Sequence, residues 1–191
     1  MGSESAPGLS RRGMLSLAGV SVASLALLLL LFSRLVAAGH AVNQAPSSPL
    51  IGHPAPDFTI VTWNGDAGQR VHLADLKGKA VVVNFWASWC ADCSDEARVL
   101  QAAWQKYHAD RVMFVGIAYN DQQAAGTSFL QQHGVQYPSG AEQNGTASVD
   151  YAVTGVPETV FINARGIVVS KSLGAVSDGA LDQAVQGLLR Q

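Results

Sequence analysis

Two runs of apolar residues predict buried β-strands. Residues 80–86 (AVVVNFW) and 112–118 (VMFVGIA) are almost continuous in apolar or β-branched side chains, which is typical of strands buried on both faces of a sheet. Between them, apolar side chains recur at every third or fourth position of residues 94–108, namely Ala97, Leu100, Trp104 and Tyr107. This spacing predicts a helix with one apolar face, and therefore a βαβ unit.

Shorter segments on either side extend this pattern. Asn64-Gly65 accepts positive φ and lies between two segments with strand composition, which predicts a β-hairpin. The segments that predict strands are 58–63, 70–73, 159–162 and 167–170, the last two antiparallel, and those that predict helices are 121–133, 144–152 and 177–190, the last capped by Ser177. The order is a βαβ half followed by a ββα half, with helices on both faces of a mixed sheet.

The composition fits one folded domain with appendages. A chain of 191 residues corresponds to a single domain of the usual ~100–200 residues. The 48% of hydrophobic and 14% of charged residues exclude a disordered chain. With 12 Lys and Arg against 14 Asp and Glu, no basic excess exists to neutralise phosphates, so a nucleic-acid partner is not expected.

An uncharged segment precedes the patterned region. Residues 13–33 are 21 positions without a charge, and a helix of that length would reach about 31 Å, enough to cross the hydrocarbon core of a bilayer. Arg11 and Arg12 stand before it, which favours a cytoplasmic location for residues 1–12. We therefore expect a single transmembrane anchor, with the remaining chain facing the periplasm or another extracytoplasmic space.

A cleaved export signal is the alternative for this segment. Residues 10–15 (SRRGML) resemble the twin-arginine export motif, and residues 36–38 (VAA) offer a small-residue cleavage site. Both interpretations imply export, as an anchored or as a soluble protein. Residues 34–53 contain Pro, Ser, Gly and Asn without periodicity, which is typical of a linker, so we expect the folded domain at residues 54–190.

Cys90 and Cys93 are the only cysteines, and they lie where the first buried strand gives way to the helix. The N–H groups at a helix N-terminus favour the thiolate of Cys90, the form that attacks a disulfide, and Cys93 can then resolve the mixed disulfide. A structural disulfide is a weaker interpretation, because a bridge across so short a loop removes little chain entropy. A zinc site is weaker still, because none of the five histidines stands at metal-ligand spacing from the pair. We expect no metal and no cofactor.

The segment 84–93 (NFWASWCADC) resembles the active-site strand, turn and helix of the thioredoxin family. Together with residues 54–58 (PAPDF) and 155–159 (GVPET), it resembles the membrane-anchored TlpA/ResA/CcmG (DsbE) branch over about residues 54–190. The resemblance implies an α/β thioredoxin fold, with a mixed central sheet flanked by helices, an N-terminal β extension, a central insert and one preceding transmembrane helix. It also implies a reducing role outside the cytoplasm, often in cytochrome c maturation.

The resemblance also implies roles for single residues. Pro157 matches the cis-proline that faces the cysteine pair, and the backbone at Val156 beside it is expected to pair with a substrate strand. Glu96 matches the helix acid near the pair, and Glu158 the acid that follows the proline; either can tune thiol ionisation. Asn84 stands where cytoplasmic thioredoxins have a buried acid, so Glu96 is the expected substitute. From the residues alone, both glutamates would be solvated surface groups.

Two residues beside the cysteines complete the expected site. Trp89 is expected on the exposed rim, where it either packs or contacts substrate. Family members often have proline between the cysteines, whereas this chain has Ala91 and Asp92. A carboxylate beside a thiolate costs Coulomb energy, so Asp92 should raise the pKa of Cys90, favour the disulfide and make the protein more reducing. The alternative is that Asp92 points to water and has little effect.

We therefore expect a membrane-tethered thiol–disulfide oxidoreductase that reduces disulfides of exported proteins and is re-reduced by an electron donor in the membrane. A disulfide-forming oxidase, a peroxidase and a redox-inert binding module remain as alternatives. The peroxidase is disfavoured because Ala87 stands where the Pro-x-x-x-Thr-x-x-Cys motif has threonine. The intact cysteine pair argues against the binding module.

Overall fold

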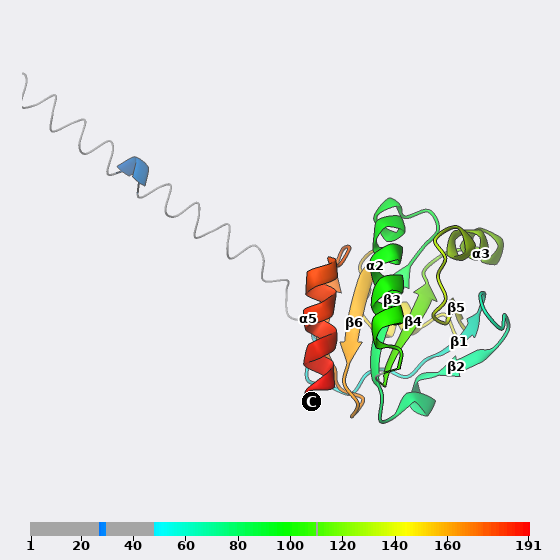
Figure 1. The fold of residues 1–191 in the computed structure, drawn as a ribbon, viewed down its shortest axis with the longest axis horizontal. Coiled ribbons are helices and arrows are strands. Elements are labelled where there is room, and N and C mark those ends of the chain that lie inside the picture. Colours follow the sequence, from blue (N-terminus) through cyan, green and yellow to red (C-terminus); the bar gives the residue numbers. More distant parts are fainter. Residues whose placement is uncertain (1–26, 30–47, 110) are drawn as a thin grey trace, which may run out of the picture. The chain divides into compact units, whose positions relative to one another are not determined.

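The computed structural model describes residues 27–29, 48–109 and 111–191. Residues Pro46–Gln191 form one compact unit, whose seven-stranded sheet has the order β2-β1-β5-β4-β3-β6-β7. The strands are β1 (Thr59–Thr62), β2 (Arg70–His72), β3 (Ala80–Trp86), β4 (Val112–Ala118), β5 (Ser139–Glu142), β6 (Glu158–Ile162) and β7 (Val168–Leu173). The helices are the 3-10 helix η1 (Leu73–Leu76), α2 (Ala91–Tyr107), α3 (Gln123–Gln132), α4 (Ala147–Asp150) and α5 (Asp178–Leu189) (Figure 1).

The central strands confirm what the apolar runs predict. β3 and β4 pair in parallel along their whole length, and every residue of β3 is buried. On its other side β3 pairs with β6 in antiparallel register, and β6 pairs with β7 in the same way. β1 and β2 form the expected hairpin. The sheet is therefore mixed, as the fold class requires.

The sequence pattern does not predict β5. Its four residues, Ser-Gly-Ala-Glu, contain no β-branched or aromatic side chain, although β5 joins the hairpin to the central sheet by pairing with β1 and β4. A Cβ atom on Gly140 would lie 2.0 Å from the backbone oxygen of Val61. The close approach of β1 and β5 therefore requires glycine, at the cost of local strand propensity.

The three long helices share one face of the sheet and the short helices η1 and α4 lie on the other, so helices cover both faces as the sequence predicts. Side chains of α2, α3 and α5 pack with Val82 and Trp86 of β3 in one buried cluster, whereas Val81 and Phe85 point into a second cluster with side chains from η1 and α4. This alternation is the period of two that a strand imposes. In Figure 1, α2 and α5 lie side by side over the sheet, and residues of the two helices contact each other.

The helix ends explain where the cysteines lie. α2 begins at Ala91, three residues before the segment 94–108 that predicts it, and Cys90 is its N-cap. The cap of α5 is confirmed, because the Ser177 side chain accepts a hydrogen bond from the N–H of Ala180. α4 is shorter than the segment 144–152 that predicts it.

Ordered contacts begin ahead of the expected domain start at residue 54. The N–H of Gly52 donates to the carbonyl of Val168 at 2.8 Å, and the N–H of Val168 donates to the carbonyl of His53 at 3.0 Å.

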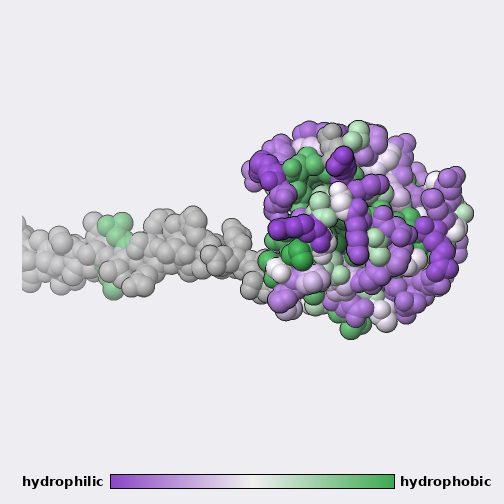
Figure 2. All heavy atoms as spheres, turned by 90° about the horizontal axis from the view of Figure 1, so that it is seen from below, coloured by the Kyte–Doolittle hydropathy of each residue, from purple (hydrophilic) through white to green (hydrophobic). Residues whose placement is uncertain are grey.

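The expected transmembrane segment 13–33 lies outside the described residues except for Leu27–Leu29, which are helical. In the part of the chain that the structure describes, no helix has the length and apolarity to cross a bilayer. The face of the domain drawn in Figure 2 is mainly hydrophilic, with hydrophobic residues in separate patches.

Candidate active site: a cysteine pair opposite a proline loop

The antiparallel register of β3 and β6 brings two distant segments to one edge of the sheet. Phe85 near the end of β3 pairs with Glu158 at the start of β6. The segment that follows β3 contains both cysteines, and the segment that precedes β6 contains Val156 and Pro157. These segments therefore face each other, although the sequence separates them widely.

Cys90 and Cys93 form a disulfide, with sulfur atoms 2.13 Å apart and Cα atoms 5.3 Å apart. The N–H of Cys93 donates to the sulfur of Cys90 at 3.1 Å, so the first turn of α2 directs a donor at this sulfur. Such donors and the helix dipole stabilise a thiolate once the bridge is reduced. Cys90 is 7% exposed and Cys93 2%. Cys90 is therefore the sulfur that a partner reaches first.

The Val156–Pro157 peptide bond is cis, as the resemblance implies. The carbonyl oxygen of Val156 lies 3.5 Å from the sulfur of Cys90, and Val156 itself is half-buried. The loop that ends at Pro157 thus forms one wall beside the reactive sulfur. A substrate strand lying along Val156 would present its own sulfur to Cys90.

Glu96 of α2 is buried, with 1% of its surface exposed. Its oxygens accept hydrogen bonds from the side chain of Asn84 at 2.8 Å, the N–H of Val176 at 2.9 Å and the hydroxyl of Thr159 at 3.4 Å. Desolvation by burial raises the pKa of Glu96, and the bonds from Val176, Asn84 and Thr159 lower it by less. A carboxyl group whose pKa is raised holds a proton to higher pH than an exposed glutamate does.

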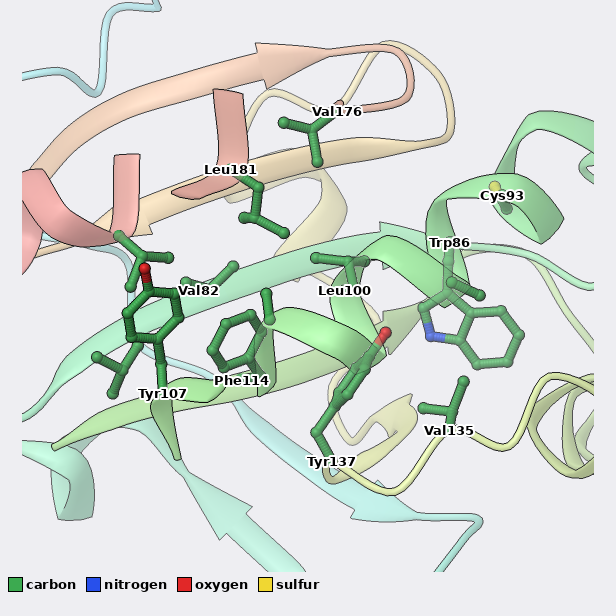
Figure 3. Close-up of a cluster of buried hydrophobic side chains, with 14 of the residues drawn as sticks. Val82, Trp86, Cys93, Leu100, Tyr107, Phe114, Val135, Tyr137, Val176 and Leu181 are labelled. Atoms are coloured by element: carbon green, nitrogen blue, oxygen red, sulfur yellow. The ribbon is translucent and has the colours of Figure 1, made fainter. Parts of the chain in front are cut away.

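Helix geometry places Glu96 beside Cys93, the less exposed of the two cysteines. Glu96 follows Cys93 by three positions on α2, and both side chains are buried in the sheet-facing side of the helix. Side chains three positions apart are neighbours on a helix surface. Cys93 and Val176 belong to one buried cluster with Trp86 and Leu100 (Figure 3), so this carboxyl group lies at the boundary of a largely apolar environment.

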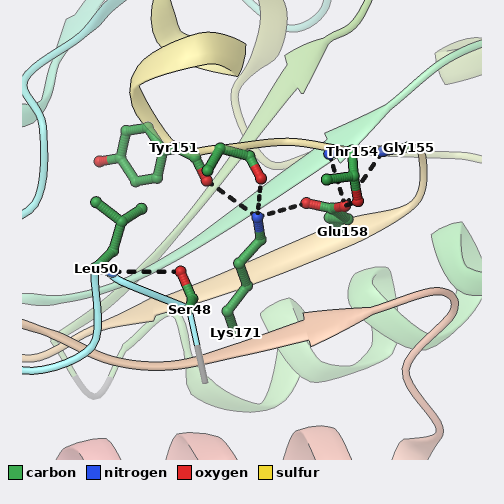
Figure 4. A network of polar contacts seen from close by, with 8 residues as sticks. Ser48, Leu50, Tyr151, Thr154, Gly155, Glu158 and Lys171 are labelled. Carbon is green, nitrogen blue, oxygen red and sulfur yellow. Dashed lines mark hydrogen bonds and ion pairs between the residues drawn. The ribbon is translucent and has the colours of Figure 1, made fainter. Parts of the chain in front are cut away.

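Glu158 is also buried, and it is fully engaged by its neighbours. One oxygen accepts from the N–H and the hydroxyl of Thr154, at 2.9 and 2.7 Å, and from the N–H of Gly155 at 3.2 Å. The other oxygen forms an ion pair with Lys171 at 2.7 Å (Figure 4). Burial alone would raise the pKa of Glu158, but the bonds from Lys171 and Thr154 lower it below its ordinary value.

The turn between β3 and α2 is fixed by a carboxylate that sequence reasoning missed. Asp121, which follows β4, accepts from the N–H of Ser88 at 2.5 Å and from its hydroxyl at 2.8 Å. Trp89 is 61% exposed, and its indole N–H donates to the carbonyl of Asn120 at 3.2 Å. Trp89 thus stands on the rim next to Cys90. The position of Asp121 at the carboxyl end of a central strand was the one available signal.

Asp92 lies in the first turn of α2 and is exposed. It shares the positive end of the helix dipole with the sulfur of Cys90, so the two groups compete for the same favourable potential.

Lys171 is the second residue that the sequence pattern missed, since a lysine in a strand is ordinarily taken to face water. Among the described residues, no group of three or more His, Cys, Asp or Glu side chains could hold a metal ion.

The chain is similar in sequence to known thiol–disulfide oxidoreductases. The model of a family described as the AhpC/TSA family matches residues 51–171. The thiol:disulfide interchange protein DsbE of Pseudomonas fluorescens biotype C is 35% identical over 132 residues, 69% of this chain and 71% of that protein. The thiol-disulfide oxidoreductase ResA of Bacillus subtilis (strain 168) is 29% identical over 142 residues, 74% of this chain and 78% of that protein.

A solved structure gives the same result for the fold. The thiol:disulfide interchange protein of the thioredoxin family from Chlorobium tepidum TLS superposes with a TM-score of 0.65 at 29% identity. The match covers 76% of this chain and 99% of that chain. The thioredoxin fold that the segment 84–93 predicts is therefore confirmed.

Proposed function

Given that the chain belongs to the AhpC/TSA family and is a thiol–disulfide oxidoreductase, we propose that it reduces disulfides in exported proteins. A donor in the membrane would then re-reduce it. As in the TlpA/ResA/CcmG branch that the sequence resembles, cytochrome c maturation is the expected setting. The uncharged segment 13–33 supports a location at the membrane with the domain on its outer side. An exported soluble form is the alternative for that segment.

The observation that supports this function most directly is the sulfur of Cys90 at the N-terminus of α2, facing the Val156 carbonyl. A helix N-terminus favours the thiolate that attacks a disulfide. Cys93 forms a disulfide with Cys90, which is the product expected when Cys93 resolves a mixed disulfide on Cys90.

The reaction starts from the reduced cysteines. The thiolate of Cys90 attacks one sulfur of the substrate disulfide, and the other substrate sulfur leaves as a thiolate that takes up a proton. The substrate then remains bound to Cys90 by a mixed disulfide along Val156. Cys93 loses its proton and attacks the sulfur of Cys90, which releases the second substrate sulfur as a thiol. The substrate has gained two electrons and two protons, and the protein is left with the Cys90–Cys93 disulfide.

Glu96 is the group we assign to the proton of Cys93. Cys93 is almost completely buried, so bulk water has little access to its thiol. The carboxyl group of Glu96 lies one helical turn away, and burial raises its pKa, which makes it a better proton acceptor than an exposed glutamate. Trp89 and Val156 are the residues we assign to substrate contact. Asp92 is assigned to tuning of the redox potential.

A single-turnover assay with insulin tests the proposal. The purified protein is reduced, freed of reductant and mixed with excess insulin, and the thiols of both proteins are counted by alkylation. We expect the protein to lose two thiols and insulin to gain two. Cys90→Ser should be inert, and Cys93→Ser should stop at a stable mixed disulfide. Ser94→Ala is the matched control, since it removes one oxygen next to Cys93 and should leave the exchange unchanged.

The redox potential separates a reductase from an oxidase. A reductase should have a potential near that of thioredoxin, about −270 mV, and an oxidase one near that of DsbA, about −120 mV. Insulin reduction by Cys90→Ser at the rate of the unsubstituted protein would refute the proposal. Full biological activity of a protein in which both cysteines are serine would favour the redox-inert binding module instead.

A further inference from the structure

We propose that Lys171 is a positioning residue for the exchange reaction. Together with Glu158 it fixes the loop 151–155, and thereby the wall formed by Val156 and Pro157 opposite Cys90. The inference rests on the proposed reductase function and adds a residue that lies outside the cysteine motif.

Lys171 lies in the middle of β7, where it pairs with Val160 of β6. Its side chain is only 5% exposed, and that of Glu158 3%. Buried lysines need partners, because an uncompensated ammonium in the interior is very costly. The ammonium of Lys171 has three N–H groups, and three oxygens surround it: Glu158 at 2.7 Å, and the carbonyls of Tyr151 at 3.0 Å and Ala152 at 2.7 Å.

The two charged side chains hold the loop through opposite kinds of backbone group. Lys171 binds carbonyl groups at the end of α4, whereas Glu158 accepts the N–H groups of Thr154 and Gly155. Four of the five residues 151–155 are thus bound by one ion pair (Figure 4). The residue that follows them is Val156.

The loop depends on this ion pair at two points. Ala152 has a φ of 49°, a left-handed conformation that is unfavourable for alanine, and its carbonyl is held by Lys171 at 2.7 Å. The N–H groups of Tyr151, Ala152 and Val153 bond back to α4, but those of Thr154 and Gly155 bond to Glu158. The part of the loop nearest Val156 is therefore fixed by side chains and not by secondary structure.

A fixed loop matters for protein substrates in particular. A substrate strand that lies along Val156 binds more weakly if the loop must first be ordered, because the ordering free energy is subtracted from the binding free energy. The attack at the sulfur of Cys90 does not involve Lys171. Loss of Lys171 should therefore raise KM for a protein disulfide and leave kcat, and the reduction of a small disulfide, nearly unchanged.

Lys171→Met tests this, because methionine retains most of the apolar stem without the charge. We expect the KM for insulin to rise about tenfold or more, which corresponds to the loss of about 1.4 kcal/mol of binding free energy, with kcat within about twofold because the reacting sulfur is untouched. The rate with a small aromatic disulfide such as DTNB should not change. Amide exchange at Thr154 and Gly155 should accelerate. The matched control is Lys106→Met, which removes an exposed ion pair with Asp182 on α2 and α5 and should change none of these quantities.

A second variant covers the case in which Lys171→Met does not fold, since a lone buried carboxylate is destabilising. In Lys171→Met/Glu158→Gln no charge is left unpaired, and the carbonyls of Tyr151 and Ala152 still lack the ammonium. Its KM for insulin should also rise. An insulin KM within twofold of the unsubstituted value in either folded variant overturns the inference.

Amide exchange in the unsubstituted protein gives a test that needs no variant. The N–H groups of Thr154 and Gly155 should be protected to the same degree as those of β6, and unprotected amides at these two positions would overturn the inference. Absence of insulin reduction by the unsubstituted protein would refute the proposed function instead. The two failures are therefore distinguishable.

Discussion

Replacing Glu96 with glutamine removes the ionisable carboxyl group one helical turn from Cys93 and keeps the shape of the side chain. The side-chain oxygen of glutamine can still accept from the N–H of Val176, which lies 2.9 Å from Glu96 in the unsubstituted protein. The new amide group would face the amide of Asn84, at present a donor at 2.8 Å. Asn84 can rotate by 180° to present its oxygen, and the Thr159 hydroxyl can donate or accept. We expect a cost of about 1 kcal/mol for this rearrangement.

The effect of Glu96→Gln on stability should depend on pH. Desolvation by burial raises the pKa of Glu96 in the folded protein, so the folded state holds this proton more tightly than the unfolded chain. The free energy of unfolding therefore falls as the pH rises from the ordinary glutamate pKa to the raised one, by about 1.4 kcal/mol for each unit between them. Glutamine does not titrate. Relative to the unsubstituted protein, Glu96→Gln should become more stable as the pH rises through this window.

The rate of disulfide reduction by Glu96→Gln should fall, in contrast to its relative stability. General acid–base catalysis contributes ~10²- to 10⁴-fold, so the rate of insulin reduction at neutral pH should fall by at least the lower figure, and the pH profile should lose the ionisation of Glu96. Urea unfolding between pH 4 and 8 and single-turnover exchange over the same range measure both effects. Asp95→Asn is the control, because Asp95 is an exposed neighbour paired with Arg98 at the surface. An unchanged pH profile in Glu96→Gln would refute the assignment of the proton to this residue.

Three further predictions concern single substitutions. Asp92→Asn should raise the redox potential by ~10–30 mV, measured against a glutathione buffer, because it removes a screened negative charge beside the Cys90 thiolate; a fall would contradict this. Ser177→Ala should lower the free energy of unfolding by ~0.5–1 kcal/mol in urea, through loss of the N-cap of α5. Gly140→Ala should cost ~1–3 kcal/mol or more, because its Cβ would meet the Val61 oxygen. Gly179→Ala, in the first turn of α5, where a Cβ would meet no atom within 4 Å, should stabilise the protein by ~0.5–1 kcal/mol. Equal stability of these two variants would contradict the reasoning.

The parts of the fold that follow from local pattern could be predicted. β3 and β4 are nearly continuous apolar runs, and α2 shows its buried face every three or four residues, so tertiary context was not needed to find them. β5 could not be found in this way. Gly140 is required by the distance between two strands, and that distance is a property of the assembled sheet.

The cysteines of the site could also be predicted, but the state of its carboxylates could not. Nothing near Glu96 or Glu158 in the sequence distinguishes them from surface glutamates, and both are almost completely buried. Their partners come from other elements: Asn84 from β3, the N–H of Val176 from the segment before α5, and Lys171 from β7. Burial of a charge depends on such distant partners, and local periodicity has no signal for it.

The antiparallel pairing of β3 with β6 also decides when, during biosynthesis, the reactive sulfur is shielded. Cys90 and Cys93 emerge from the ribosome well before β6 has been synthesised, and contacts between segments so distant in sequence form slowly. Until residues 158–162 dock beside β3, the nascent chain exposes both thiols to whatever oxidant or unpaired cysteine it meets. Whether the two thiols of the nascent chain avoid disulfides with other molecules therefore depends on how quickly residues 158–162 are synthesised and pair with β3.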